Sequence, residues 1–384
     1  MQDFKFNNPV KILFGKGQIA SISEQISPNA KVLMVYGGGS IKQNGVYEQV
    51  IAALGDRSVI EFGGVEPNPK LETLTAAIEI ARSNSIDFLL AVGGGSVIDA
   101  TKFIAAATHF QGDPWDILAK REPVASALPL GTVLTLPATG SEMNRFFVIT
   151  NDTTQEKVGY GSEQVFPQFS VLDPETTFSL PLRQISNGIV DAFTHTVEQY
   201  LTYPVHAPLQ DRMAESILTT LIEEGPKTLA DPADYESRAN VMWCASMALN
   251  GLIGAGVPQD WATHMIGHEL TALYQLDHAQ TLAVVLPSLL QVKQDKKKTK
   301  LLQYAERVWN ITAGDESQRI SQAIASTAQF FASVGVATRL SDYRVDQSAI
   351  KRVAQKLDKQ GATGLGEHQD ISPTDVERIL TLSA

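Results

Sequence analysis

The stretch DFLLAVGGGSVIDATKFIAAATHF, residues 87–110, decides the fold class. Residues 87–92 are a short, mostly apolar run, 93–96 are Gly-Gly-Gly-Ser, and 96–110 have the apolar periodicity of a helix. This order predicts a buried strand, a tight glycine turn and a helix. A strand that runs through a turn into a helix is the building unit of a parallel sheet covered by helices.

The first half of the chain repeats this texture. Residues 71–84 read as a second helix, and the further predicted strands are 31–36, 58–63, 131–137 and 169–174. From about residue 182 the pattern changes to long segments with apolar residues at intervals of three and four, at 186–202, 207–230, 235–254 and 258–275. Pro181 marks the boundary. We therefore expect an α/β fold, with a parallel-sheet domain over 1–181 and an all-helical domain over 182–384.

The bulk composition describes an ordinary globular protein. Its 384 residues suggest two domains, and 43% hydrophobic and 19% charged residues exclude a disordered or fibrous chain. A net charge of -11 argues against nucleic acid as a partner, because phosphate binding needs a basic face. The one basic run, KQDKKKTK at 293–300, is expected to be a solvated helix end or loop.

Targeting and redox signals are weak. No segment approaches the roughly 20 apolar residues that span a bilayer, so no membrane partner is expected, and no secretory signal is visible. Cys244 is the only cysteine, which excludes an internal disulfide. These features predict a cytoplasmic protein.

Two glycine turns indicate a phosphate-bearing ligand. Gly-Gly-Gly-Ser occurs at 37–40 and again at 93–96, each time between a predicted strand and a helix start. Glycines there let a ligand approach the backbone, and the N–H groups of a helix N-terminus suit a pyrophosphate. One such turn alone is more often an ordinary tight connection. Two of them, at the carboxyl ends of parallel strands, favour a nucleotide. Neither matches G-x-G-x-x-G.

The first turn also predicts which nucleotide. NAD sites usually place an acidic residue at a strand end in this position, where it holds the ribose hydroxyls. Here Tyr36 is followed by glycines and serine without a carboxylate. A 2′-phosphate would meet no repulsion, and Gly38 and Ser40 are available as donors. We therefore expect NADPH to be preferred over NADH.

Histidines and one aspartate indicate a metal site. Asp191 and His195 are four residues apart in a helical pattern, as are His264 and His268, so each pair shares a helix face. His278 follows a probable turn and is available as a further ligand. One carboxylate with three imidazoles suits a divalent ion such as Fe(II), Zn(II), Co(II) or Ni(II). Any single histidine is more often a core or surface residue; the cluster favours a site.

Two hydrolase alternatives are not supported. In the zinc-protease motif H-E-x-x-H the glutamate follows the first histidine, whereas Glu269 follows the second. No G-x-S-x-G elbow of a serine hydrolase occurs.

A set of motifs follows in order along essentially the whole chain. They are KILFGKG, YGGGS, EPNP, AVGGGSVIDATKFIAAA, TLPATGSEMN, DAFTHTVEQY, GAGVPQDWATHMIGHELTA and LDHAQTLAVVLP. With these motifs the chain resembles the iron-containing (group III) alcohol dehydrogenase family, within which it most resembles NADPH-dependent broad-specificity aldehyde reductases and butanol dehydrogenases.

The resemblance implies a Rossmann-like dinucleotide-binding domain, a helical metal and substrate domain as in dehydroquinate synthases, and a cleft between them. It implies a homodimer as well. The implied metal ligands are Asp191, His195, His264 and His278, and His268 matches a histidine that stays off the metal near the substrate. The implied cofactor-binding residues are Gly38, Gly39, Ser40, Gly94, Gly95, Ser96, Asp99, Thr135, Thr139, Ser141, Asn144 and Lys157.

One segment departs from the family pattern. Arg145, Phe146 and Phe147 stand where related chains have small residues. That segment borders the nicotinamide in the family, so either the pocket is altered, or the two phenylalanines fill a strand and the arginine lies at its surface.

The implied activity is the reversible reduction of short-chain aldehydes to primary alcohols. A divalent ion, Fe²⁺ or Zn²⁺ by the resemblance, polarises the carbonyl oxygen, and we expect His268, or a water it positions, to deliver the proton. Two alternatives stay open. A dehydroquinate synthase-like lyase would bind NAD and a multiply charged substrate in a pocket richer in Lys and Arg; a non-enzymatic nucleotide-binding module would have no need of a Lewis acid.

Overall fold

Six parallel strands form one sheet in the order β1-β8-β5-β4-β2-β3. In the computed structural model, which describes all 384 residues, this sheet belongs to a compact unit of Asn7–Leu180 and Pro232–Met242, called here the sheet unit. The α/β prediction is confirmed. The strands are β1 (Lys11–Phe14), β2 (Lys31–Tyr36), β3 (Ser58–Phe62), β4 (Phe88–Gly94), β5 (Leu130–Leu136) and β8 (Phe169–Leu172).

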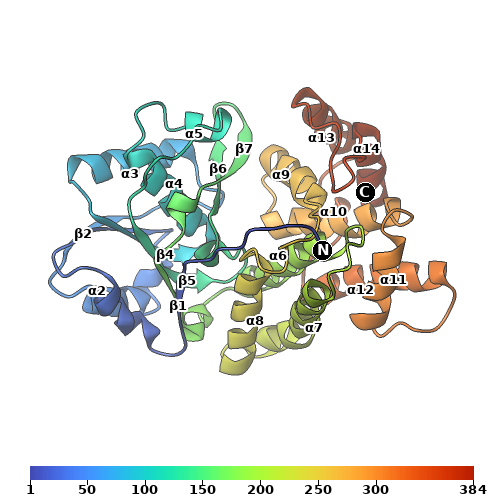
Figure 1. Ribbon diagram of the computed structural model, residues 1–384, viewed down its shortest axis with the longest axis horizontal. Coiled ribbons are helices and arrows are strands. Elements are labelled where there is room, and N and C mark those ends of the chain that lie inside the picture. Colours follow the sequence, from blue (N-terminus) through green and yellow to red (C-terminus); the bar gives the residue numbers. More distant parts are fainter. The chain divides into compact units, whose positions relative to one another are not determined.

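Helices cover both faces of the sheet (Figure 1). Val32 and Met34 of β2 pack in one core with α1 (Ile22–Gln25) and α2 (Val46–Leu54), while Leu33 and Val35 pack in the other with α3 (Leu71–Ser83) and α4 (Gly95–Thr108). Because successive residues of a strand point to opposite faces, a strand buried on both sides must be apolar throughout. This explains the continuous apolar runs in the sequence.

Three strands lie outside the five predicted. β1 is a four-residue edge strand, too short for its pattern to stand out from a loop. β6 (Phe146–Asn151) and β7 (Glu156–Gly161) form an antiparallel pair apart from the main sheet, and β6 packs on α4.

The segment that departs from the family pattern divides into buried and exposed parts. Phe147 on β6 is fully buried, with its ring centroid 6.1 Å from that of Phe103 and 5.7 Å from that of Tyr160. Phe146 is 47% exposed, and Arg145 pairs with Glu163. One phenylalanine therefore fills the core, and any effect on a pocket would come from Phe146.

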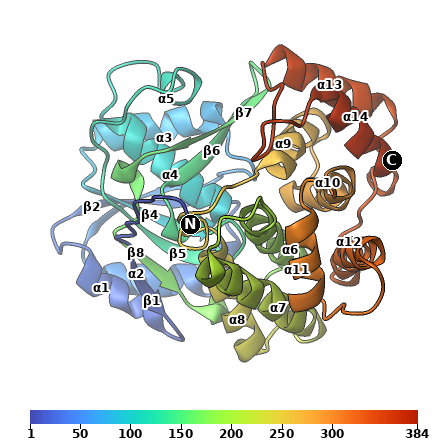
Figure 2. The same cartoon turned by 45° about the vertical axis from the view of Figure 1, so that its right-hand side comes forward.

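The second compact unit, called here the helical unit, contains Met1–Phe6, Pro181–Asp231 and Trp243–Ala384. Its helices are seen from another side in Figure 2. They are α6 (Leu182–Tyr200), α7 (Pro208–Ala230), the end of α8 (Tyr235–Ala248), α9 (Ala262–Tyr274), α10 (His278–Val292), α11 (Lys298–Arg307), α12 (Glu316–Ser333), α13 (Ser348–Lys359) and α14 (Pro373–Leu382). None of them combines the length and apolar character that crossing a membrane requires.

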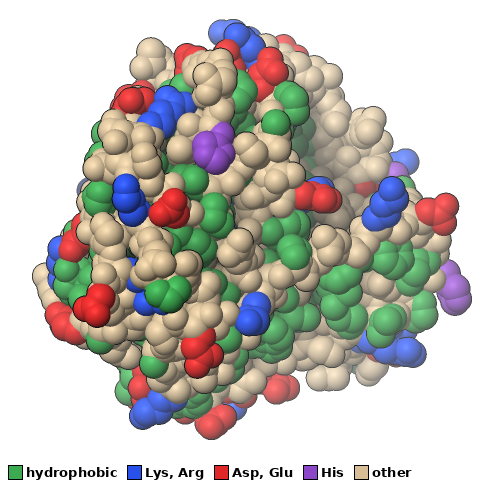
Figure 3. All heavy atoms as spheres, turned by 60° about the vertical axis from the view of Figure 1, so that its left-hand side comes forward, with side chains coloured by type: hydrophobic (Ala, Val, Ile, Leu, Met, Phe, Trp, Pro, Cys, Tyr) green, Lys and Arg blue, Asp and Glu red, His purple; other side chains and the backbone are tan.

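The basic run at 293–300 corrects one expectation. Lys296 and Lys298 are exposed as predicted, but Lys297 and Lys300 are buried and paired with carboxylates. Their three-residue spacing places both on the inward side of the helix start. On the face drawn in Figure 3, blue and red side chains are interspersed rather than gathered by sign.

Candidate metal centre and nucleotide turns

One face of α6 organises the candidate metal centre. Arg183, Asn187, Asp191 and His195 follow one another at intervals of four, which aligns their side chains along the helix. Asp191 and His195 are buried. The predicted one-turn separation of these two residues is therefore present, inside the helical unit.

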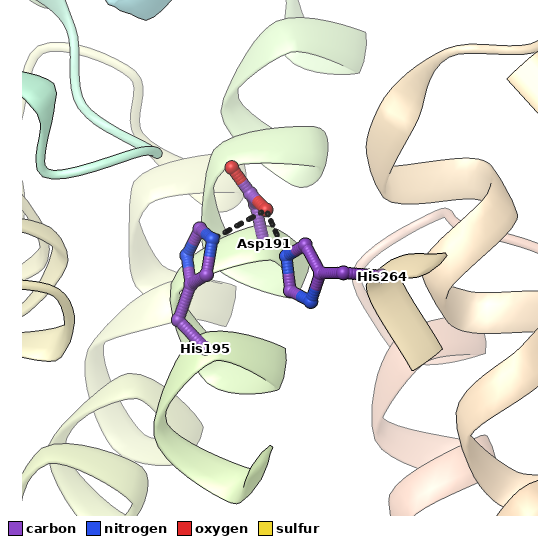
Figure 4. A group of neighbouring side chains, drawn as sticks. All are labelled: Asp191, His195 and His264. Atoms are coloured by element: carbon purple, nitrogen blue, oxygen red, sulfur yellow. Dashed lines mark ion pairs between the residues drawn. The ribbon is translucent and has the colours of Figure 1, made fainter. Parts of the chain in front are cut away.

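Three imidazole nitrogens surround one carboxylate oxygen of Asp191. The distance from Oδ1 to Nε2 is 3.6 Å for His195, 3.9 Å for His264 and 3.7 Å for His278. Figure 4 shows Asp191 and His195 projecting from one helix toward His264 on another. The rings of His195 and His264 are stacked, with centroids 4.6 Å apart.

This donor set fits a divalent transition ion. In a tetrahedral zinc site with bonds of about 2.1 Å, neighbouring ligand atoms lie about 3.4 Å apart, close to the spacing around Asp191. Asp191, His195 and His264 each offer a donor atom within 4.8 Å of the others. Burial lowers the pKa of His195 to about 4, so its imidazole is neutral at pH 7, the form that coordinates metals.

Glu198 is a functional candidate that the sequence analysis missed. It lies seven residues after Asp191 on the same face of α6 and is buried. One of its oxygens contacts Nδ1 of His264, and the other accepts a hydrogen bond from the backbone N–H of Thr263 at 2.7 Å. This contact turns Nε2 of His264 toward Asp191. The spacing of seven, two helix turns, was the available signal.

A buried ion pair holds the start of α9. Asp260 accepts a hydrogen bond from the N–H of Ala262 at 2.8 Å, and Lys297 donates to Asp260 at 2.6 Å and to Glu367 at 2.7 Å. Trp261 has a φ of 62°, so the helix begins only after it. Residues 258–261 of the predicted helix are therefore outside α9.

His278 is positioned by the N-terminus of α10, of which it is the first residue. Asp277 caps this helix and accepts hydrogen bonds from Arg183 and Asn187 of α6, both at 2.7 Å. Gly267 of α9 lies against Thr281 of α10, where an added Cβ would be 2.8 Å from the hydroxyl oxygen. A glycine at this point lets the two helices approach closely.

His268 lies one turn after His264 on α9. Its ring centroid is 6.3 Å from that of His264 and 5.3 Å from that of His278. It is partly exposed and lies outside the buried group of Asp191, His195 and His264. The structure therefore brings all five predicted residues together, with His268 at the edge of the cluster.

The two glycine turns lie next to each other in the sheet unit. β2 and β4 are adjacent, and Tyr36 stands opposite Val92, so both turns leave the same edge of the sheet. The order in which strands are added to the sheet also reverses here. β3 lies on one side of β2, whereas the next strands, β4 and β5, lie on the other side. Ligands of open α/β sheets bind at such switch points.

The first turn is open to solvent. Gly38 and Ser40 are exposed, and a Cβ added at Gly38 or Gly39 would touch nothing within 4 Å. Gly39 has a φ of 93° and precedes the short 3₁₀ helix η2 (Ser40–Lys42). Only Gly39 needs glycine for its backbone conformation.

Close packing explains the glycines of the second turn. An added Cβ at Gly93 would collide with Val97, at Gly94 it would lie 2.9 Å from Leu136, and at Gly95 it would collide with Thr139. No side chain caps α4, so the N–H groups of its first turn are available to an anionic ligand.

Three predicted cofactor residues take part in an internal network. Asp99 accepts hydrogen bonds from Ser141 Oγ at 2.6 Å and from the N–H of Val148 at 3.0 Å. Fully buried Lys102 donates to Ser141 at 2.9 Å and to Asn144 at 3.1 Å. Burial lowers the pKa of Lys102 to about 8. This network favours a supporting role for Asp99, Ser141 and Asn144.

Lys102 was missed because it follows Asp99 by three residues in an otherwise apolar helix, where a solvated lysine is the usual case. Of the remaining predicted residues, Thr135 lies within β5, and Thr139 packs against Gly95. Lys157 on β7 donates a hydrogen bond to Asn68 at 2.8 Å.

Comparison with known proteins places this architecture in a family. Residues 9–174 match the family described as iron-containing alcohol dehydrogenase, and residues 185–383 match its C-terminal domain family. The chain belongs to the iron-containing alcohol dehydrogenase family.

Individual relatives cover the full length of the chain. It is 58% identical over 381 residues to the NADPH-dependent aldehyde reductase YqhD of Escherichia coli (strain K12), with 98% of each chain covered. It is 43% identical over 388 residues to the probable NADH-dependent butanol dehydrogenase 1 of Bacillus subtilis (strain 168), with both chains fully covered.

Solved structures of related proteins have the same fold as this chain. The crystal structure of E. coli K-12 YqhD superimposes with a TM-score of 0.99 at 56% identity and covers 100% of this chain and 99% of that one. The NADH-dependent butanol dehydrogenase A of Thermotoga maritima gives a TM-score of 0.96 at 36% identity, with the same coverage.

Proposed function

We propose that this protein is an NADPH-linked, metal-dependent aldehyde reductase that converts short-chain aldehydes to primary alcohols and also runs in reverse. The observation that carries the proposal is the convergence of three Nε2 atoms on Oδ1 of Asp191, at 3.6, 3.9 and 3.7 Å. Membership of the family and 58% identity to a protein named as an NADPH-dependent aldehyde reductase support the activity.

We assign the two proposed binding functions to the two halves of the chain. Residues 1–181 supply the dinucleotide-binding domain and 182–384 supply the metal and substrate domain. Asp191, His195, His264 and His278 would hold one divalent ion, Fe²⁺ or Zn²⁺, since a set of three imidazoles and one carboxylate suits these ions.

When bound, the metal supplies a Lewis acid that polarises the carbonyl oxygen, and NADPH supplies the hydride. The side chains of this protein prepare and complete the reaction. Asp191 brings the only negative charge among the four proposed ligands, and Glu198 fixes the orientation of His264. His268, or a water molecule hydrogen-bonded to it, would deliver the proton that turns the reduced oxygen into a hydroxyl group.

The proposed cofactor preference rests on the first glycine turn. Gly38 and Ser40 are exposed and available to a 2′-phosphate, and β2 ends without a carboxylate. We propose that the Gly94–Ser96 turn receives the pyrophosphate, with Thr135, Thr139 and Lys157 along the nucleotide. Asp99, Ser141 and Asn144 would support this segment from behind through Lys102.

The deciding experiment follows the near-ultraviolet absorbance of NADPH after butanal is added to the purified protein, with and without a chelator. Loss of absorbance that stops on chelation and returns with Fe²⁺ or Zn²⁺ is expected. A dehydroquinate synthase-like lyase and a non-enzymatic nucleotide-binding module both predict no loss. Comparable kcat/KM with NADH and NADPH would overturn the cofactor assignment while leaving the reductase assignment intact.

We also propose a homodimer in the cytoplasm. The family resemblance supports the dimer, and the single cysteine supports a reducing compartment. Light scattering coupled to size-exclusion chromatography tests the dimer.

A further inference from the structure

A carboxylate does lie beside the first glycine turn, on the neighbouring strand. β3 pairs in parallel with β2, and Glu61 of β3 stands opposite Met34. Oε2 of Glu61 accepts a hydrogen bond at 3.0 Å from the hydroxyl of Tyr36, which is the residue directly before the turn. An isolated negative charge here would repel a 2′-phosphate bound at Gly38 and Ser40.

The negative charge of Glu61 is balanced by the positive charge of Lys42, which lies beside it. Lys42 Nζ lies 2.7 Å from Oε2 of Glu61, and the Tyr47 hydroxyl donates to Oε1 at 2.5 Å. The hydrogen bonds from Lys42 and Tyr47 hold the pKa of Glu61 below its usual range, so the group is charged at pH 7. The pair therefore combines a full positive and a full negative charge.

Lys42 belongs to the turn itself. It is the last residue of the 3₁₀ helix that starts at Ser40, and its N–H donates to the carbonyl of Gly39 at 3.0 Å. The ammonium lies 5.0 Å from the ring centroid of Tyr36 and 4.7 Å from that of Tyr47. An added Cβ at Gly63 would collide with the Tyr36 ring, so glycine at that position admits the ring.

We propose that the Lys42–Glu61 ion pair sets how strongly this turn prefers a ligand with a 2′-phosphate, with Lys42 attracting the phosphate and Glu61 opposing it. The inference rests on the proposed NADPH function and extends it to two residues with no assigned role. The side chains of Lys42 and Glu61 are 42% and 31% exposed, so both charges reach the solvent in which a phosphate would bind.

The test compares 2′,5′-ADP with 5′-AMP, two probes that differ by the 2′-phosphate, in calorimetric titrations of the full-length protein. K42M is expected to raise the Kd of 2′,5′-ADP about tenfold, equivalent to one lost charged contact, and that of 5′-AMP less than about twofold. E61Q should lower the Kd of 2′,5′-ADP. The double variant K42M/E61Q should return close to wild type, because both charges are then absent.

K120M is the matched control, since Lys120 is also an exposed lysine paired with a carboxylate, Asp116, at 2.9 Å. It should leave both Kd values unchanged. The effect of K42M should shrink at high salt, because exposed charges are screened.

The outcomes separate this inference from the proposed function. Equal weakening of both probes by K42M, or no weakening, would overturn the role of the ion pair. A wild-type protein that binds 5′-AMP as tightly as 2′,5′-ADP would instead overturn the NADPH assignment.

Discussion

Glu198 holds Nδ1 of His264 while Nε2 of the same ring faces Asp191. An imidazole that donates one nitrogen to a carboxylate has its tautomer and orientation fixed for the other nitrogen. In this protein the orienting carboxylate and the oxygen at the centre of the cluster both come from α6. The geometry of the site therefore depends on one helix face as much as on the histidines.

Glu198→Gln should weaken metal binding while the fold is retained. A carboxylate that orients a metal-binding histidine through its other ring nitrogen usually contributes about 10–100-fold to metal affinity. The measurement is competition for Zn²⁺ against a chromophoric chelator, with thermal unfolding recorded in parallel. Glu215→Gln is the control, because Glu215 is also buried and hydrogen-bonded, to Tyr200 at 2.8 Å, but on α7. Unchanged affinity in the Glu198 variant would remove its role in orienting His264.

His268→Ala should lower turnover by at least about 100-fold while metal content stays near the wild-type value, because the proposed proton donor is lost and the four proposed metal ligands are intact. Metal analysis and steady-state kinetics are measured on the same preparation. Asp191→Ala and His264→Ala are the comparison variants and should lose both metal and activity. Loss of metal from the His268 variant would show that His268 is itself a ligand.

Gly38→Asp should reverse the cofactor preference. The backbone of Gly38 has no positive φ, and a side chain there meets open space, so the substitution is expected to fold. Its carboxylate would repel a 2′-phosphate and accept hydrogen bonds from the ribose of NADH. We expect kcat/KM for NADPH to fall at least about tenfold relative to that for NADH, one such factor being about 1.4 kcal/mol. Gly38→Asn, similar in size and uncharged, should change the ratio much less.

Lys102 should make the free energy of unfolding rise as the pH increases from about 8 to 10.5. Its pKa in the folded protein is about 8, below the ordinary 10.5, because burial disfavours the charged form. Between these two values the unfolded chain binds more protons than the folded one, so stability contributed by this residue rises with pH. At about 1.4 kcal/mol for each unit of pKa shift, the rise is on the order of 3 kcal/mol.

Chemical denaturation of wild type and Lys102→Met between pH 7 and 10.5 isolates this contribution. The variant loses the hydrogen bonds to Ser141 and Asn144 at every pH, which shifts its stability by a constant amount. The difference between the two proteins should grow in favour of wild type as pH rises. A difference that is independent of pH would contradict the lowered pKa.

Local sequence patterns predicted the central sheet well. The strands at 31–36 and 131–137 are buried on both faces, so most of the residues in them are apolar. Such an apolar run can be recognised from the local sequence alone. β1 and the β6–β7 pair gave weaker signals, because four residues at an edge and a partly exposed hairpin obey no strict periodicity. The end of helical segment 235–254 was also placed too late, since α8 stops at Ala248.

The candidate site was predicted only as far as local spacing reaches. Asp191 and His195 share a helix face, and this is readable from their separation of four. Glu198 and Lys297 act through partners 66 and 37 residues away, His264 and Asp260, and no local pattern reveals such pairs. The basic run around Lys297 predicts a solvated charge, because burial of this lysine depends on Asp260 and Glu367, which only the fold brings to it.

The chain passes between the two units at residues 6–7, 180–181, 231–232 and 242–243. During synthesis, the sheet unit is therefore incomplete until residue 242 has left the ribosome, although its strands end at Leu172. The first six residues must wait longer, because they pack with helices that are made afterwards. At about 5–20 residues per second, His278 follows Asp191 by several seconds. Nascent chains consequently carry half of the proposed metal ligands before the other half exists, and a fragment cut at residue 181 would retain neither unit whole.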